Sequence, residues 1–317
     1  MTLRAAVIGL GVMGARHARV WPTIPSIELV AVADPLIPIP GGLFTFSDFR
    51  TMLAEMRVDL VSVAVPTSLH REVTIAALQM GCHVLVEKPI AVDRGEAREM
   101  MAAARDAGRI LTVGHIERFN PAITQLRQML PELGPIYEIH ASRSGPFPAR
   151  IRDVGVVVDL APHDLDLMRY LTRSEPIRLY AEMERRVIDQ HEDVLAGVLR
   201  FANGVIGTLN INWLAPTKFP HMLVVTGEDG TLEADLGNHR LDFYPKTGRL
   251  LRIGIEDQRE PLAIELEAFA EAVRSGGPPP VPPEDATIAL LLSRCMIAAA
   301  RYGSVISGQG LRRAISP

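Results

Sequence analysis

The segment AAVIGLGVMGARH, residues 5–17, decides the fold of the first part of the chain. It begins as a continuous apolar run, which is typical of a buried strand, and it continues with a pattern compatible with a helix. Between the two stand Gly9, Gly11 and Gly14, which leave the amides at the helix N-terminus accessible to a pyrophosphate. We therefore predict a strand, a phosphate-binding loop and a helix in this order.

Asp34 supports this interpretation, because it ends the next apolar run, LVAVAD, about 20 residues after Gly14. A carboxylate there can accept hydrogen bonds from the ribose hydroxyls of a dinucleotide and repels a 2′-phosphate, so the pattern favours NAD over NADP. Alternatively, the glycines only form a tight turn that Asp34 caps. The residues expected to line the pyrophosphate are Gly9, Gly11, Val12, Met13 and Gly14.

The apolar runs LVSVAVP, HVLVEKP and RILTVGH follow, separated by helical patterns. Strands that alternate with helices and are apolar throughout indicate a parallel sheet covered on both faces. We predict that residues 1–120 form a doubly wound α/β domain that binds NAD.

The chain changes character beyond Pro121. A helical segment around DLAPHDLDLMRYL is followed by successive strands, with hairpin turns at Asn203-Gly204 and Asp229-Gly230. Strands without intervening helices indicate a mostly antiparallel sheet. We predict that residues 121–317 form an α+β domain with a large open sheet.

A proline-rich segment, SGGPPPVPPED at residues 275–285, comes before the last helical pattern. Its prolines favour a stiff, exposed connection, and Glu284 and Asp285 are suited to cap the helix that follows.

Composition excludes several classes of function. The 317 residues are 48% apolar, which allows a large core, and the formal net charge of -4 gives no basic excess for nucleic-acid binding. No apolar run reaches the ~18 residues of a membrane span. We expect neither a nucleic-acid nor a membrane partner.

The two cysteines, Cys82 and Cys295, show neither metal-ligand nor CxxC spacing, which predicts buried, inert thiols in a reducing compartment. The N-terminus superficially resembles a secretory signal, but the spacing of its glycines argues for a phosphate loop. These observations lead us to expect a cytoplasmic protein.

Two further stretches follow strands at the carboxyl edge of the predicted sheet, where ligands of doubly wound folds collect. In PTSLH, residues 66–70, Pro66, Thr67 and His70 could line the nicotinamide side of the cofactor, although Thr67 is equally suited to cap a helix.

In HVLVEKPIAV, residues 83–92, a buried strand ends on Glu87 and Lys88, both expected near the cofactor. An ammonium at this edge can hold a substrate hydroxyl and stabilise the oxygen anion that develops as a hydride leaves carbon. The alternative is a solvated Lys88 that pairs with Glu87. A cis bond before Pro89 would fix the direction of the lysine.

In DLAPHDLD, residues 159–166, the spacing places Asp159, His163 and Asp166 along one face of a helix. His163 can accept a hydroxyl proton and Asp159 can orient its ring, while Asp166 serves the substrate or supports the site. Pro162 is tolerable if the helix has only just begun. The alternatives are a structural histidine with acids that favour the helix dipole, or metal ligation; we expect no metal.

GLGVMGARH, VPTSLH, VEKP and DLAPHDLD, in this order, resemble the Gfo/Idh/MocA family of nicotinamide-dependent sugar and polyol oxidoreductases. The resemblance covers nearly the whole chain. It implies a Rossmann domain, an α+β domain whose open sheet builds a homodimer or homotetramer, and catalytic roles for Lys88, Asp159 and His163.

Three longer stretches, GHIERFNPAI (114–123), RSGPFPARIRDVGVVVDLAPHDLD (143–166) and NWLAPTKFP (212–220), resemble the branch that acts on UDP-N-acetylglucosamine and UDP-sugar uronates. This implies NAD-dependent oxidation of the sugar C3 hydroxyl, which prepares a 3-amino sugar. The substrate-binding residues that it implies are Lys88, Arg118, Asn120, Arg143, Arg150, Asp159, His163, Trp213 and Lys218.

The arginines in these stretches, Arg118, Arg143, Arg150 and Arg152, could bind a diphosphate bidentately or be solvated loop residues, and both interpretations stay open. The roles of Lys88 and His163 could also be exchanged. Alternative functions are a dehydrogenase of another sugar or polyol, a glycosidase that uses NAD transiently, and a nicotinamide or sugar sensor without catalysis.

Overall fold

The computed structural model describes residues 2–36, 44–148, 154–187 and 190–317. Contacts within the chain define two compact units. The first comprises Met1–Ile116, Glu260–Thr287 and Pro317, and the second comprises Glu117–Arg259 and Ile288–Ser316.

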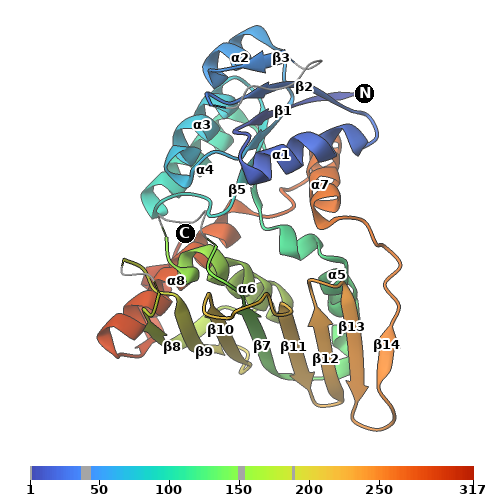
Figure 1. Ribbon diagram of the computed structural model, residues 1–317, viewed down its shortest axis with the longest axis vertical. Coiled ribbons are helices and arrows are strands. Elements are labelled where there is room, and N and C mark those ends of the chain that lie inside the picture. The colour runs from blue at the N-terminus through green and yellow to red at the C-terminus, as the bar shows by residue number, and fades with distance from the viewer. Residues whose placement is uncertain (1, 37–43, 149–153, 188–189) are drawn as a thin grey trace. The chain divides into compact units, whose positions relative to one another are not determined.

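The first unit is the predicted doubly wound α/β structure (Figure 1). Among the described residues, its parallel sheet has six strands in the order β3-β2-β1-β4-β5-β6, the strand order of dinucleotide-binding folds. Helices α3 and α4 cover one face of the sheet, and α1 and α7 cover the other (Figure 1). The elements are β1 (Leu3–Ile8), α1 (Val12–Val20), η1 (Trp21–Thr23), β2 (Ile27–Ala33), β3 (Phe44–Phe46), α2 (Phe49–Glu55), β4 (Leu60–Val63), α3 (Thr67–Gln79), β5 (His83–Glu87), α4 (Arg94–Ala107), β6 (Leu111–Gly114) and α7 (Pro261–Ser275).

Helix α7 packs in this first unit, whereas the division at residue 120 assigned it to the second domain. Its apolar side chains join the core around Trp21, and the rings of Trp21 and Phe269 lie 6.4 Å apart. Leu262 and Leu266 are also buried there. The apolar stripe of α7 thus completes the face of the sheet that α1 begins to cover.

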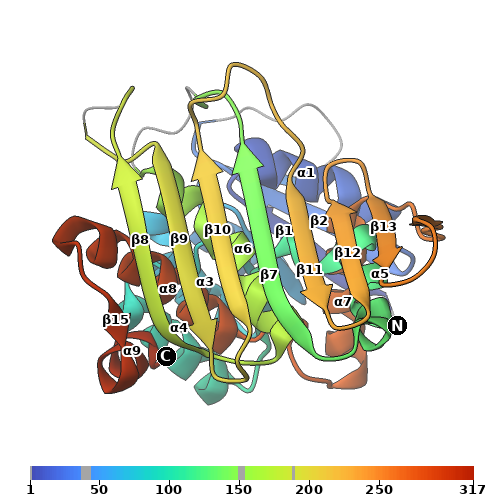
Figure 2. The same ribbon diagram turned by 90° about the horizontal axis from the view of Figure 1, so that it is seen from below.

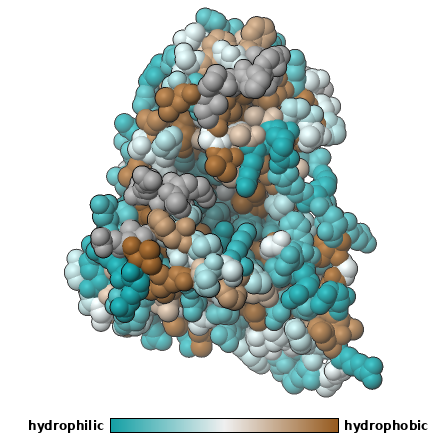
Figure 3. All heavy atoms as spheres, in the orientation of Figure 1, coloured by the Kyte–Doolittle hydropathy of each residue, from teal (hydrophilic) through white to brown (hydrophobic). Residues whose placement is uncertain are grey.

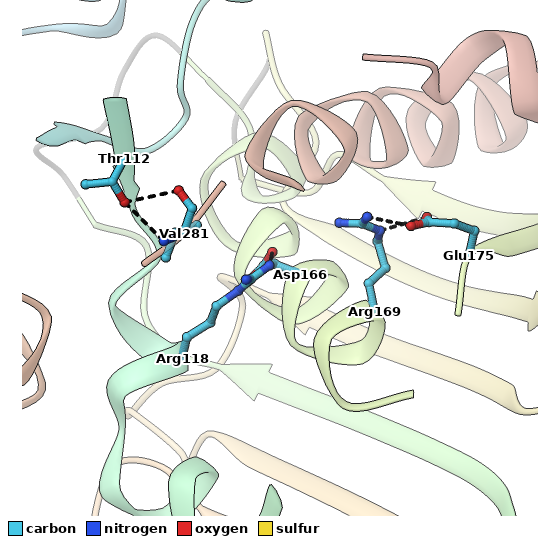
Figure 4. Close-up of polar contacts among 6 residues, drawn as sticks. All are labelled: Thr112, Arg118, Asp166, Arg169, Glu175 and Val281. Carbon is cyan, nitrogen blue, oxygen red and sulfur yellow. Dashed lines mark hydrogen bonds and ion pairs between the residues drawn. The ribbon is translucent and has the colours of Figure 1, made fainter. Parts of the chain in front are cut away.

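The proline-rich segment 275–285 is only in part the exposed connection that its composition suggested, because Val281 and Pro283 are buried. Val281 is fully buried, and its N–H and carbonyl oxygen both bond the Thr112 hydroxyl, each at 3.1 Å. Figure 4 shows this pair of contacts. The segment is therefore anchored to β6, and α8 (Pro283–Tyr302) begins within its last residues, with Glu284 and Asp285 in the first turn of the helix.

The second unit contains the predicted open sheet. Among the described residues it has nine strands in the order β14-β13-β12-β11-β7-β10-β9-β8-β15, in which β7 and β10 run parallel and the other neighbours antiparallel. Turns at Asn203-Gly204 and Asp229-Gly230 join β9 to β10 and β11 to β12, as predicted. The elements are η2 (Ile116–Phe119), α5 (Pro121–Met129), η3 (Leu130–Leu133), β7 (Ile136–Ser144), α6 (Val156–Thr172), β8 (Pro176–Glu184), β9 (Val194–Phe201), β10 (Ile206–Asn212), β11 (Met222–Gly227), β12 (Gly230–Asp235), β13 (Arg240–Pro245), β14 (Leu251–Ile253), β15 (Ile306–Ser307) and α9 (Gly308–Ile315).

Side chains of the open sheet alternate between a buried and a more exposed face, as expected for strands with one covered side. Helices α5, α6 and α8 lie behind the sheet in the view of Figure 2. Leu209 and Ile211 of β10 point toward this covered side and belong to the core that α6 closes.

The described residues include no helix that is long and apolar enough to cross a membrane. On the face shown in Figure 3, hydrophobic side chains form small separate groups among hydrophilic ones. Cys82 and Cys295 are both buried free thiols, as predicted.

Candidate active site

The three glycines of the first loop have three different environments. Gly9 has φ +88°, and a Cβ there would lie 2.6 Å from the carbonyl oxygen of Ala64; a Cβ on Gly14 would lie 1.8 Å from that of Gly9. Nothing lies within 4 Å of a Cβ built on Gly11. The loop is therefore closed toward the protein and open over Gly11, at the N-terminus of α1, which fits a bound pyrophosphate.

The Asp34 carboxylate stands beside this loop. Its Oδ2 accepts the Leu10 N–H at 2.7 Å and its Oδ1 accepts the Leu36 N–H at 2.8 Å. Asp34 thus caps the loop between the first two glycines. A carboxylate offers about four acceptor positions, so it is a group to which ribose hydroxyls can donate.

Pro66, Thr67 and His70 follow β4 at the same edge. Helix α3 has Pro66 as its N-cap and no side-chain cap bond, so the capping alternative for Thr67 is not realised. The His70 ring is buried, with Nδ1 at 2.9 Å from the Pro89 carbonyl oxygen and Nε2 at 3.0 Å from that of Val65. This ring joins the segments after β4 and β5 instead of presenting a surface to a cofactor.

Burial lowers the pKa of His70 below its ordinary value, although the contacts with these carbonyl groups act in the opposite direction. A neutral imidazole has a single N–H, so it donates to one of the two oxygens at a time.

Lys88 follows β5 directly and is half-buried, and its peptide bond with Pro89 is cis. Strands β1, β4 and β5 are parallel neighbours, so their carboxyl ends share one edge of the sheet. The structure therefore brings Lys88, Thr67 and the glycine loop to the same edge.

Glu87, which we expected near the cofactor, points into the protein. Its Oε1 lies 2.9 Å from Nε2 of the buried His17, and its Oε2 accepts the Lys88 N–H at 3.3 Å. A Cβ on Gly114 would lie 3.1 Å from the carboxylate, so this glycine keeps the space that Glu87 occupies. Burial alone would raise the pKa of Glu87, but the hydrogen bond with His17 and the electrostatic interactions with its neighbours outweigh burial and lower it.

Helix α6 of the second unit carries Asp159 and His163 in its first half. The helix begins at Val156, so Pro162 lies in its interior rather than in its first turn, and the helix lacks one N–H there. Because α6 is continuous, Asp159, His163 and Asp166 lie along one face, as their spacing predicted. His163 is mostly buried and Asp159 is half-buried.

Asp166 is paired with Arg118, as Figure 4 shows. The Arg118 Nε and Nη2 donate to the two carboxylate oxygens at 2.7 and 2.6 Å, and the guanidinium lies 4.7 Å from the Tyr170 ring centre. Both partners are almost fully buried. The Arg118 guanidinium, which we expected to bind a diphosphate, thus supports α6. The end of this helix is also held by the contact between Arg169 and Glu175 (Figure 4).

Asn120 and Trp213 also make internal contacts. Asn120 caps α5 by accepting the Ala122 N–H at 3.0 Å, and its amide donates to Glu117 and to the Leu236 carbonyl oxygen. Trp213 is 4% exposed and packs edge-on against Phe147 at 5.7 Å between ring centres. Both side chains hold the substrate-side segments in place.

The segments that carry Arg143 and Lys218 lie side by side. Arg143 lies near the carboxyl end of β7, Lys218 follows the parallel strand β10, and Pro146 forms a bridge with Leu214. The Lys218 Cα lies 3.9 Å from a Cβ built on Gly145, and the Lys218 side chain is exposed.

The first half of α6 lies at this same end of the sheet. A Cβ on Gly207, at the start of β10, would lie 3.3 Å from the Met168 sulfur in the second half of α6. At the other end, the Val156 N–H at the start of α6 bonds the Glu192 carbonyl oxygen, and the Trp213 N–H just after β10 bonds the carbonyl oxygen of Asp193, so the helix and strand run in opposite directions. The second unit therefore brings Asp159 and His163 to the end that carries Arg143. Arg150 and Arg152 lie outside the described residues.

A buried charged cluster next to His163 was not predicted. His221 Nε2 lies 2.7 Å from Asp164 Oδ1, and His221 Nδ1 lies 3.7 Å from Glu117 Oε1. Burial alone would lower the pKa of His221, but the two carboxylates raise it to about 9 against the opposing charge of Arg143. Burial also opposes the ionised form of Glu117, yet contact with His221 lowers the pKa of Glu117. These contacts tie α6 to η2 and β11.

This cluster does not have the geometry of a metal site. Within the described ranges, no group of three or more His, Cys, Asp and Glu side chains could hold a metal ion. No sequence signal links His221, Asp164 and Glu117, because they are distant in the chain and each resembles an ordinary loop or helix residue.

Comparisons with known proteins agree with this arrangement of two units. Residues 3–115 match an oxidoreductase family with an NAD-binding Rossmann fold, and residues 123–233 match the GFO/IDH/MocA C-terminal domain.

Individual relatives act on sugars and inositols. The UDP-N-acetylglucosamine 3-dehydrogenase of Acidithiobacillus ferrooxidans is 32% identical over 288 residues, which cover 87% of this chain and 90% of that protein. The scyllo-inositol 2-dehydrogenase (NAD(+)) of Bacillus subtilis is 29% identical over 91% of both chains. A solved structure of UDP-N-acetylglucosamine 3-dehydrogenase from A. ferrooxidans has a TM-score of 0.86 at 28% identity, covering 95% of this chain and 98% of that one.

Proposed function

Because the chain belongs to the Gfo/Idh/MocA family of NAD-binding oxidoreductases, we propose that it oxidises the C3 hydroxyl of UDP-N-acetylglucosamine to a ketone. The observation that carries the chemistry is the position of Lys88, which ends β5 at the sheet edge that also carries the glycine loop. The choice of this sugar as the substrate rests on the similarity to the A. ferrooxidans enzyme. A 3-keto product is suited to transamination into a 3-amino sugar.

The fit to NAD rests on this chain's own residues. The open space over Gly11 leaves room for the pyrophosphate, and the Asp34 carboxylate at the same loop disfavours a 2′-phosphate. NAD, when bound, supplies the acceptor for the hydride that leaves the sugar carbon.

We assign the remaining chemistry to three side chains. The imidazole of His163 takes the proton of the reacting hydroxyl, and Asp159, one helical turn earlier, orients the ring and stabilises its charged form. The Lys88 ammonium donates to the hydroxyl oxygen and stabilises the negative charge that develops there. Exchange of the proton-accepting role between Lys88 and His163 is the alternative that kinetics must decide.

For the UDP portion we propose Arg143 and Lys218, which lie at the carboxyl-terminal ends of the neighbouring strands β7 and β10. A guanidinium can bind a diphosphate bidentately, and the exposed ammonium can add a further charge. Arg150 belongs to the same sequence segment and stays a prediction.

The substrate is tested by incubating the purified protein with NAD and UDP-N-acetylglucosamine. Reduced cofactor, followed by absorbance, together with a sugar that has lost two hydrogens by mass spectrometry, would support the proposal. An unchanged sugar, with turnover of a UDP-uronate, an inositol or a glucoside instead, would redirect the assignment. Cleavage of a glycoside without net reduced cofactor would indicate a hydrolase of the same family.

The roles of the side chains are tested by Lys88→Ala and His163→Ala, with His191→Gln as a control. General acid or base work predicts a loss of turnover of ~100-fold or more for each variant. NAD binding by His163→Ala, measured by calorimetry, should stay close to that of the parent protein. Near-normal turnover in both folded variants would refute the mechanism.

We also propose that the open face of the large sheet mediates a homodimer or homotetramer. Val198 and Ile206 point away from the covered side and are 49% and 36% exposed. They line a cavity of about 140 Å³ with Arg178, Tyr180 and Arg200. In sedimentation experiments the parent protein should form a dimer or tetramer, and Val198→Glu should be a monomer. A monomeric parent protein would refute the proposed assembly.

A further inference from the structure

A buried chain of four polar side chains ends next to Lys88. Trp21 Nε1 donates to the Ser62 hydroxyl oxygen at 2.9 Å, this oxygen lies 3.0 Å from His17 Nδ1, and His17 Nε2 lies 2.9 Å from Glu87 Oε1. Trp21, Ser62 and His17 are fully buried, and Glu87 is 7% exposed. The four residues come from η1, β4, α1 and β5, all within the first unit.

The chemistry of these groups sets the direction of the hydrogen bonds. An indole N–H can only donate, so the Ser62 oxygen accepts from Trp21, which leaves the hydroxyl hydrogen for His17 Nδ1. A neutral His17 then carries its proton on Nε2 and donates it to Glu87, whose ionised carboxylate can only accept. In this arrangement every donor has an acceptor, and the negative charge lies at the end beside Lys88.

This chain is not a route for protons. It ends at Trp21, which cannot accept a proton, and its other members are enclosed in the core of the unit. These hydrogen bonds must therefore act by fixing the position and the charge of the Glu87 carboxylate.

Two features connect these four side chains to the sheet edge that carries the glycine loop and Lys88. His17 lies on α1, which begins at the glycine loop, and Glu87 Oε2 accepts the backbone N–H of Lys88 at 3.3 Å. The charged or titratable groups that act on Glu87 are His17 from α1, His70 from α3, and Lys88. Gly114 on β6 has no side chain, so it leaves the space that the Glu87 carboxylate occupies.

We propose that Glu87 is a positioning residue for Lys88: the buried chain holds the Glu87 carboxylate inside the protein, where it accepts the Lys88 backbone N–H and places a negative charge beside this residue. This inference rests on the proposed function only in taking Lys88 as a catalytic residue. It links the helix of the cofactor loop to the reacting lysine through hydrogen bonds that touch neither cofactor nor substrate.

The composition of the chain permits a direct measurement, because Lys88, Lys218 and Lys246 are its only lysines. Protein labelled with ¹³C- and ¹⁵N-lysine gives one side-chain Cε–Nζ signal for each, and Lys218→Arg and Lys246→Arg assign them. The Lys88 signal is titrated from about pH 7 to about pH 11 in the parent protein, Glu87→Gln and Ser62→Ala.

Glu87→Gln removes the charge and keeps the shape, so the Lys88 titration midpoint should move to lower pH by about one unit. Ser62→Ala removes two hydrogen bonds and keeps the charge, so it should reduce thermal stability without moving the midpoint. Signals of Lys218 and Lys246 should stay unchanged. An unmoved Lys88 midpoint in Glu87→Gln, or an equal movement in both variants, would overturn the proposal.

If Glu87→Gln does not fold, Glu87→Asp replaces it. The aspartate keeps the charge but withdraws it by one methylene, so the midpoint should move in the same direction by a smaller amount. This measurement needs neither NAD nor a sugar, so a wrong substrate leaves it intact. With an active substrate, Glu87→Gln should lower kcat about tenfold and leave the KM for NAD within about twofold.

Discussion

The buried imidazolium of His221 should make a large contribution to the stability of the second unit. It lies 2.7 Å from the fully buried Asp164 carboxylate and also contacts Glu117. His221→Gln removes the charge, keeps a polar side chain, and leaves Asp164 without its charged donor. Breaking a buried ion pair in this way costs about 3 to 5 kcal/mol.

The raised pKa of His221 leads to a similar magnitude for this contribution to stability. Its rise from 6.5 to about 9 corresponds to about 3 kcal/mol, since one pKa unit is worth about 1.4 kcal/mol. The folded state binds the proton more tightly than the unfolded state, so this contribution is complete below about pH 6.5 and is lost as the pH rises through about 9. The difference between parent and His221→Gln should thus be about 3 kcal/mol at about pH 6 and below about 1 kcal/mol at about pH 10.

Each unit carries one of the two tryptophans, which makes the assay specific. Urea unfolding of 5-fluorotryptophan protein is followed by ¹⁹F NMR, in which Trp213 reports the second unit and Trp21 the first. Only the Trp213 transition should move in His221→Gln, and the control His191→Gln should leave both transitions in place. A loss below about 1 kcal/mol, or one that is equal at both pH values, would refute the reasoning.

Further substitutions test the loop and α6. Gly14→Ala should destabilise the first unit by about 3 kcal/mol because its Cβ meets backbone, whereas Gly11→Ala should unfold like the parent within about 0.5 kcal/mol and bind NAD about tenfold more weakly; equal unfolding midpoints for the two would contradict this. Asp34→Ser should raise the KM for NAD about tenfold or more and increase the use of NADP, and an unchanged NAD to NADP ratio of kcat/KM would count against the ribose role. Arg118→Met should cost about 3 to 5 kcal/mol in urea unfolding by leaving Asp166 buried without its partner, and Arg118→Met with Asp166→Leu should recover most of this; no recovery would mean that the pair is not the cause.

The first half of the fold follows from local patterns. The Rossmann strands are continuous apolar runs, and Gly9, Gly11 and Gly14 occupy positions where a strand must turn into a helix. Asp34 follows at a fixed distance because the next strand returns beside the first. These features depend on residues that are close in the chain, so one sequence suffices to predict them.

Strand β7 was not predicted, although it lies in the middle of the large sheet. Its sequence, IYEIHASRS, places polar residues at most positions, because one face is only partly covered and its end carries Arg143. Its pairing with β10 joins residues about 70 positions apart, a non-local contact that no turn signal announces. Helix α7 was assigned to the wrong unit for a similar reason, since its partner Trp21 stands near the other end of the chain.

The candidate site shows the same limit. Sequence motifs led us to predict roles for Lys88, Asp159 and His163, but they could not show that Arg118 is held by Asp166 or that Glu87 turns inward toward His17. Buried polar partners are chosen by the tertiary fold, where an unpaired charge is costly. A motif predicts which side chains are present, whereas the packing decides which of them are available to a ligand.

The most direct test of the account uses UDP-N-acetylglucosamine that carries deuterium on C3. After reaction with the purified protein and NAD, mass spectrometry of the reduced cofactor shows whether the deuterium has moved to the nicotinamide. We predict that the reduced cofactor carries one deuterium and that the 3-keto sugar has lost its label. Reduced cofactor without deuterium, or a labelled sugar that is returned unchanged, would contradict hydride transfer from C3.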